Sequence, residues 1–337
     1  MPEFLERLSS SDVKTVLLAG CGGGFDFVHA SLIWPELRRL GKEVVWHSYS
    51  FGRPERIGDA PLVWSSEGVE VRRVSSDCIP PVDYCPEVHL ASYLDSQRVD
   101  DESHWLYASY ARDWTVPSLT EFYTHLVREH DLDAVVLFDG GSDSLMMGDE
   151  EGLGDPIEDA VSVAAVSNLE VEIKLLVAVG LGADRFNHVS DGATLRAVAE
   201  LRSLGGFLGS LSIDSRMARQ YRELLEHIYA RQEFRSVLSG CIAAAARGLH
   251  GSEVVPEDMA HRVREGGVYI WPLMAMLWGF DVDSVASRSL IVDWIRDVGT
   301  VRGCYEALEA GRADLELRQV EELPSHSKYR NPWGKFY

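Results

Sequence analysis

The chain has few cysteines, and they do not occur in pairs. Its 337 residues include five, at Cys21, Cys78, Cys85, Cys241 and Cys304. An odd, scattered set without a C-x-x-C pair argues against a disulfide framework and against a structural zinc site. We therefore expect reduced thiols and a protein of the cytoplasm.

Positive charge and long apolar runs are also scarce. The 32 Lys and Arg residues face 53 Asp and Glu residues, which gives a formal net charge of −21 at pH 7. Such an acidic surface repels nucleic acids and anionic membranes. No apolar run approaches the roughly 20 residues that span a bilayer, and residues 1–12 do not resemble a signal peptide. We expect a soluble protein that binds a small molecule, and neither nucleic acid nor a membrane.

The usual nucleotide and hydrolase motifs are missing. The glycine loop after the first apolar run does not match G-x-G-x-x-G, because Phe25 is sixth from Gly20 and Phe27 is sixth from Gly22. The second strand-like run ends in His-Ser-Tyr-Ser, with no acid to hold a ribose, so a nicotinamide cofactor is disfavoured. No Gly-Lys-Ser/Thr and no G-x-S-x-G sequence is present, which argues against a P-loop and an α/β-hydrolase.

Apolar runs that alternate with helical patterns are what the chain does have. The strand-like runs are at about 14–19, 43–49, 62–74, 133–138, 170–179 and 267–277. Continuous Val and Leu runs are typical of strands that are covered on both faces. We therefore predict an α/β fold: a doubly wound, mostly parallel sheet with helices on both faces.

Composition does not force a division into domains. We expect one α/β domain over residues 1–337, with two halves joined near 205–215 as the alternative. Residues 76–117 combine prolines, aromatics and acids, which suits either a lid over the site or a peripheral packed insertion. Residues 325–337 are basic and aromatic and form a C-terminal tail, which docks or frays.

Two glycine loops follow strand-like runs. In the first, Gly22, Gly23 and Gly24 precede Asp26. Glycines let an anion approach the backbone N–H groups, so we expect this loop to hold a ligand, with a tight structural turn as the alternative. Asp26 either binds a hydroxyl, an amine or a metal, or it caps a helix or accepts N–H groups of the loop.

The other glycine loop follows the run at 170–179. It contains Gly182, Asp184, Arg185 and His188. Arg185 offers two parallel N–H donors to a carboxylate or phosphate, and His188 is a candidate acid/base group. A salt bridge and a packed surface position are the simpler explanations of these two residues.

The strongest chemical signal is the acid-rich loop between residues 139 and 155, which holds six carboxylates. Asp139 ends a strand-like run and is followed by Gly140, Gly141 and Asp143. Clustered carboxylates suit Mg²⁺ bound together with a phosphorylated ligand, and they also suit general acid/base catalysis. Asp139 and Asp143 are our candidates for both roles.

Four stretches together resemble a family known as domain of unknown function 1152. They are residues 22–26, 139–143 with 148–150, 155–160, and 278–288. The resemblance implies a Rossmann-like fold in which these loops belong together, and it implies no activity, because none is established for the family. The family pattern has no serine before the second acid of the middle stretch, whereas Ser142 stands there in this chain.

These patterns favour an enzyme of the transferase or hydrolase type that acts on a small polar or phosphorylated metabolite. The first glycine loop would hold an anionic group, Asp139 and Asp143 would bind Mg²⁺ or move protons, and Arg185 would orient the substrate. Two alternatives stay open. One is a non-catalytic ligand-sensing or scaffold subunit, for which a homodimer is expected, and the other is a nicotinamide-dependent oxidoreductase.

Overall fold

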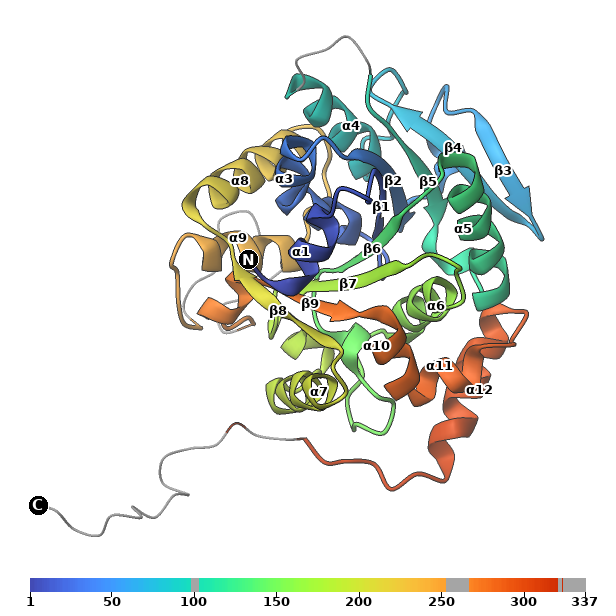
Figure 1. Ribbon diagram of the computed structural model, residues 1–337, viewed down its shortest axis with the longest axis vertical. Coiled ribbons are helices and arrows are strands. Elements are labelled where there is room, and N and C mark those ends of the chain that lie inside the picture. The colour runs from blue at the N-terminus through green and yellow to red at the C-terminus, as the bar shows by residue number, and fades with distance from the viewer. Residues whose placement is uncertain (98–102, 253–266, 321–322, 324–337) are drawn as a thin grey trace, which may run out of the picture.

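A single mixed sheet forms the centre of the molecule. The computed structural model describes residues 1–97, 103–252, 267–320 and 323. Within these residues, nine strands pair in the order β3-β4-β5-β2-β1-β6-β7-β9-β8 (Figure 1). Only β4 and β9 run against the others. The predicted mostly parallel α/β sheet is therefore confirmed.

The five central strands are parallel neighbours. They are β5 (Trp105–Tyr110), β2 (Glu43–Ser50), β1 (Thr15–Gly20), β6 (Ala134–Asp139) and β7 (Ile173–Val179). The outer strands are β3 (Leu62–Ser66), β4 (Val69–Ser75), β8 (Phe207–Ser212) and β9 (Met276–Asp281). Every residue of β1 and β6 is buried, which explains why these runs are apolar without alternation.

Helices cover both faces of the sheet. One face carries α5 (Val116–His130), α6 (Pro156–Ser167), α7 (Asp191–Ser203), α10 (Val282–Arg288), α11 (Leu290–Ile295) and α12 (Val301–Ala313). The other carries α1 (Glu3–Ser9), α2 (Asp26–His29), α3 (Trp34–Arg39), α4 (Pro86–Ser96), α8 (Ser215–Tyr229) and α9 (Val237–Ala246). Figure 1 shows α5 and α6 on one side of the sheet and α3, α4 and α8 on the other. None of the helices in the described part of the chain is both long and apolar enough to cross a membrane.

Two predicted strands differ from the structure. The run at 62–74 is a hairpin, because Glu67 and Gly68 turn the chain with positive φ and separate β3 from β4. The run at 267–277 is mostly not a strand, since β9 begins only at Met276 and is preceded by a short 3₁₀ helix (Pro272–Ala275).

The structure shows where two segments of undecided role lie, residues 76–117 and residues 205–215. The described part of 76–117 supplies α4, and it supplies β5, which pairs with β2 and β4 inside the sheet. Around the alternative junction at 205–215, β8 forms one edge of the same sheet. The predicted tail at 325–337 lies outside the described residues.

Candidate functional site

The loops that follow β1, β6 and β7 line one cavity. These strands are adjacent and parallel, so their carboxyl ends lie at the same edge of the sheet. The cavity has a volume of about 300 Å³. The predicted residues that line it are Gly22, Gly23, Gly24, Asp26, Asp139, Gly140, Asp143 and Asp184. Three distant parts of the sequence therefore share one site.

Four predicted site residues do not line this cavity. Gly141 packs against the Asp184 carboxylate. Gly182 lies against the Trp271 indole nitrogen. Arg185 donates to Asp191 (Nε to Oδ2, 2.8 Å), and its guanidinium lies 4.5 Å from the Trp271 ring centroid. His188 is exposed and has a φ of 67° at the end of a 3₁₀ helix.

The aspartates of the cavity connect its loops to one another. Both oxygens of Asp26 accept backbone N–H groups, from Gly22 at 2.9 Å and from Gly140 at 3.0 Å. Asp184 Oδ2 accepts the Ser142 N–H at 2.7 Å. These bonds fix the three strand-end loops relative to each other, so the carboxylates are structural acceptors as well as candidate ligands.

The first glycine loop already uses its own backbone donors. Gly22 donates to Asp26, Gly23 donates to Glu158 Oε2 at 3.2 Å, and Gly24 donates to the carbonyl of Tyr49 at 3.1 Å. A Cβ atom on Gly22 would collide with the carboxylate of Asp159. The absence of side chains at these glycines therefore leaves room for acidic side chains of the same protein. The N–H groups that were expected to bind an anion already donate to acceptors within the chain.

The first turn of α6 brings two acids that sequence reasoning did not select. Glu158 and Asp159 are both buried and line the cavity. Asp155–Pro156 marks the start of this helix directly after the acid-rich loop, and that was the available signal: acids in a first turn point back toward the loop that precedes them. Arg112, which lies just after β5, also lines the cavity and was not selected from the sequence.

Burial in a negative environment raises the pKa values of the acids that line the cavity. Desolvation, reinforced by Asp143, raises the pKa of Asp139 to about 8. Desolvation also raises the pKa of Asp143 to about 6 and that of Glu158 to about 7. The same cause, followed by neighbouring carboxylates, raises the pKa well above its ordinary value at Asp26, Asp159 and Asp184.

Little positive charge balances this cluster. Among the described residues that line the cavity, Arg112 is the only Lys or Arg. Its Nε donates to Glu158 Oε1 at 3.3 Å, and its side chain is 55% exposed. Buried carboxylates that lack cationic partners must hold protons or bind a cation. The electrostatics of the site therefore favour a positively charged ligand.

Three carboxylates are close enough to share such a cation. Asp26, Asp139 and Asp159 each place one oxygen within 4.8 Å of the other two. Asp143, which was predicted to pair with Asp139, does not belong to this group. It accepts the Asp155 N–H at 3.1 Å and forms a side-chain hydrogen bond with Asp159.

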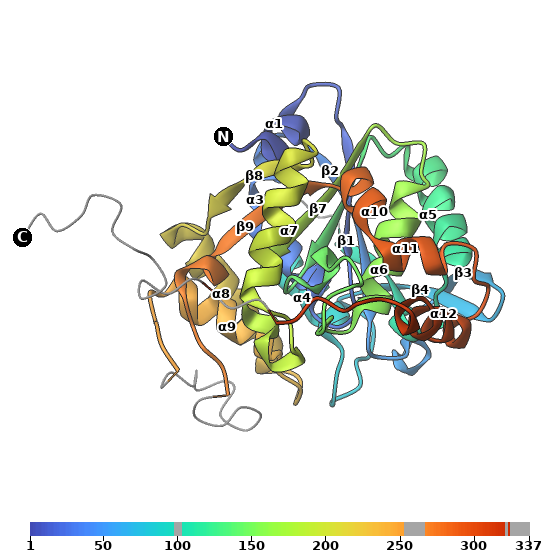
Figure 2. The same ribbon diagram turned by 90° about the horizontal axis from the view of Figure 1, so that it is seen from below.

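The acid-rich loop is held from outside by the C-terminal segment 314–320, which follows α12. Figure 2 shows this segment running from α12 back toward α7. Arg318 contacts Asp149 (Nη2 to Oδ1, 2.5 Å) and Glu150 (Nη2 to Oε1, 2.7 Å). The Glu150 carboxylate also accepts N–H groups of the loop itself, from Met147 at 3.0 Å and from Gly148 at 2.8 Å. The Glu150 carboxylate and Arg318 thus hold this loop in place by hydrogen bonds and ion pairs.

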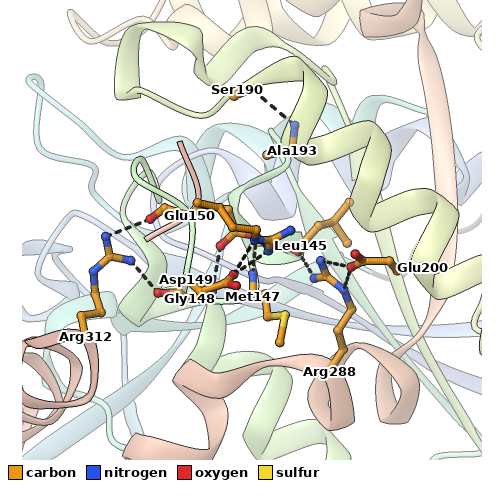
Figure 3. A network of polar contacts seen from close by, with 11 residues as sticks. Leu145, Met147, Gly148, Asp149, Glu150, Ser190, Ala193, Glu200, Arg288 and Arg312 are labelled. Carbon is orange, nitrogen blue, oxygen red and sulfur yellow. Dashed lines mark hydrogen bonds and ion pairs between the residues drawn. The ribbon is translucent and has the colours of Figure 1, made fainter. Parts of the chain in front are cut away.

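Two more arginines hold the loop by its carbonyl groups. Arg312 donates to Gly148 at 2.6 Å and to Glu150 at 2.9 Å. Arg288 donates to Leu145 at 2.7 Å. Figure 3 shows these two side chains reaching the loop from opposite sides. The loop that carries Asp143 and leads to α6 is therefore fixed by three arginines.

Comparison with known proteins identifies a family for this chain. No curated protein and no solved structure matches the chain. A family model described as protein of unknown function (DUF1152) matches residues 112–322. This range includes the acid-rich loop and α6, and it begins after the first glycine loop. The chain belongs to the DUF1152 family.

Proposed function

We propose that the protein is an enzyme that acts on a small phosphorylated metabolite, by transfer or hydrolysis, in the cavity at the carboxyl ends of β1, β6 and β7. The observation that carries the proposal is the gathering of Asp26, Asp139, Asp143 and Asp184 around one cavity. Catalytic sites of open α/β sheets lie at this edge, and clustered acids with raised pKa values are typical of such sites.

In this proposal the acids of the cavity would hold a divalent cation such as Mg²⁺. The glycine-loop N–H groups are occupied, so a phosphate needs positive charge from elsewhere. A cation held by the carboxylates would supply that charge and would act as a Lewis acid toward the phosphoryl group. Arg112 contacts the anionic part of the substrate. It takes the role predicted for Arg185, which is paired with Asp191.

Proton transfer falls to Asp143 in this scheme. Its raised pKa of about 6 suits a general base near neutral pH. Asp143 accepts the proton of the attacking water or hydroxyl group as that oxygen bonds to phosphorus, and the leaving group departs with the bonding electrons. The carboxyl then returns the proton to solvent or to the leaving group.

Calorimetric titration with nucleotides and sugar phosphates, with and without Mg²⁺, tests the proposal. We expect at least one compound to bind only with Mg²⁺, and binding to weaken at least about tenfold in Arg112→Gln. Arg185→Gln is the matched control, because that arginine lies outside the cavity, and it should bind normally. Equal binding by wild type and Arg112→Gln would contradict the assignment.

A ligand-sensing subunit is the second candidate. It is favoured by the structural use of the carboxylates, since Asp26 and Asp184 connect the loops by accepting their N–H groups. This function predicts binding of the same compounds with no release of product. Incubating the bound compound with the protein and Mg²⁺, followed by phosphorus NMR, separates the two functions.

Location and assembly belong to the same proposal. The five cysteines are all free and buried, which supports a reducing compartment such as the cytoplasm. We expect a homodimer, and light scattering on the purified chain tests it.

A further inference from the structure

We infer that Asp26, Asp139 and Asp159 form a site for one divalent, oxygen-seeking cation, and that Oδ1 of Asp159 is its open ligand atom. The inference deepens the proposed function, on which its catalytic meaning rests. The three residues lie at the start of α2, the end of β6 and the first turn of α6. A cation bound here would join all three elements.

The spacing of the oxygens suits a hard cation. All three ligand atoms lie within 4.8 Å of one another. Oxygens on opposite sides of one ion are about 4.2 Å apart for Mg²⁺ and up to about 5.2 Å apart for Ca²⁺, given their bond lengths. A small contraction therefore closes the site on Mg²⁺ or Mn²⁺. Carboxylate oxygens alone do not select the softer transition metals.

Two of the three ligands are held in place by other groups. Asp26 is oriented by the N–H groups of Gly22 and Gly140. Asp139 Oδ2 accepts the hydroxyl hydrogen of Ser144. A carboxylate oxygen has two lone pairs, so these bonds leave acceptor capacity for a cation. Such fixed outer contacts are typical of metal ligands.

The third ligand provides the independent observation. Oδ1 of Asp159 has no hydrogen-bond partner among the described residues, although only 4% of the residue is exposed. It lies against Gly22, where a Cβ atom would collide with it, and Asp159 is one of the residues that line the cavity. A buried carboxylate oxygen without a partner is costly. A bound cation would satisfy this oxygen.

Titration of the chelator-treated full chain with Mn²⁺ alone, followed by the electron paramagnetic resonance signal of the free ion, tests the inference. We expect one Mn²⁺ per chain, displaced by Mg²⁺. Asp159→Asn and Asp139→Asn should each bind at least about tenfold more weakly. Glu87→Gln is the matched control, because Glu87 is also a buried acid with a raised pKa but lies outside the cavity, and it should bind Mn²⁺ as wild type does.

Two outcomes overturn the inference: no Mn²⁺ binding by wild type at millimolar concentration, or wild-type affinity in a folded Asp159→Asn. Thermal unfolding of each variant shows that it is folded. If Asp159→Asn binds Mn²⁺ normally while a phosphorylated compound still binds with Mg²⁺, the ligand set is wrong and the proposed function stands. If Mn²⁺ binds as expected and no phosphorylated compound does, the site stands and the proposed function fails.

Discussion

Gly140 donates its N–H to Oδ1 of Asp26 at 3.0 Å, although 114 positions separate the two residues in the chain. The other oxygen of the same carboxylate accepts the N–H of Gly22. One aspartate therefore connects the loop after β1 to the loop after β6. A residue selected from the sequence as a ligand also has a measurable structural role.

Replacing this aspartate should destabilise the protein. Asp26→Ala leaves two buried N–H groups without an acceptor, and removing a desolvated carboxylate offsets part of that loss. We expect the free energy of unfolding to fall by about 1–3 kcal/mol. Urea unfolding in the presence of a chelator measures it. Asp12→Ala, at an exposed position, should change stability by no more than about 0.5 kcal/mol. Equal stability of Asp26→Ala and wild type would refute the structural role.

The acids of the cavity should make the metal-free protein less stable as pH rises. The folded chain keeps a proton on Asp139 up to a pKa of about 8, whereas the unfolded chain releases it near 3.8. The stabilisation is full below the lower value and is lost as pH rises toward the higher one, by at most about 1.4 kcal/mol per pH unit for one group. Asp139→Asn lacks this titration. With chelator, the melting temperature of wild type relative to Asp139→Asn should therefore fall between pH 5 and pH 8. A constant difference would contradict the raised pKa.

Cation binding should release protons. A metal ion must displace the protons that burial holds on these carboxyl groups. At pH 7 we expect on the order of one proton to leave per Mn²⁺ bound. Calorimetry in buffers of different ionisation enthalpy measures this number. Wild type and Glu87→Gln should agree, and Asp139→Asn should release fewer protons. Binding without any proton release would show that the acids are ionised before the metal arrives.

The arginine of the C-terminal segment should stabilise the acid-rich loop. Arg318→Gln removes the contacts to Asp149 and Glu150, and the Glu150 side chain is only 5% exposed. Because Arg318 itself is partly exposed, we expect a loss of about 1–3 kcal/mol. Arg302→Gln on α12 is the control, since the Arg302 side chain is 88% exposed. Hydrogen exchange should quicken at residues 147–151 in Arg318→Gln alone. Unchanged exchange there would mean that the other two arginines suffice.

The centre of the sheet was predictable because its burial is visible in the sequence. β1, β6 and β7 are continuous apolar runs, since helices cover them on both faces. The outer strands carry weaker signals. β8 is an edge strand with Gly209 and Ser210 in its middle. β9 contains Gly279, where a Cβ atom would collide with the ring of Phe4 in α1. That constraint depends on a residue about 275 positions away and does not show in a local pattern.

The candidate site, like the sheet, was predictable only in part. Asp139 ends β6, and Asp26 and Asp184 come shortly after the ends of β1 and β7, so the expectation that ligands bind at strand ends finds all three. Asp159 lies in a helix, where an acid in the first turn is ordinarily explained by the helix dipole. Arg112 lies beside β5, a strand that the sequence did not reveal. Pairing of β5 with β2 brings Arg112 to the cavity, and packing of α6 against the sheet brings Asp159 there.

The position of β9 has a consequence for how the chain folds as it is made. β9 lies between β7 and β8, although it follows both of them in the sequence. Until residue 281 has left the ribosome, the outer edge of β7 has no partner strand and β8 cannot join the sheet. Chains that stop before this point expose an apolar strand edge, which is a template for aggregation. Release of the chain before residue 281 should therefore give a product that aggregates more readily than the full chain.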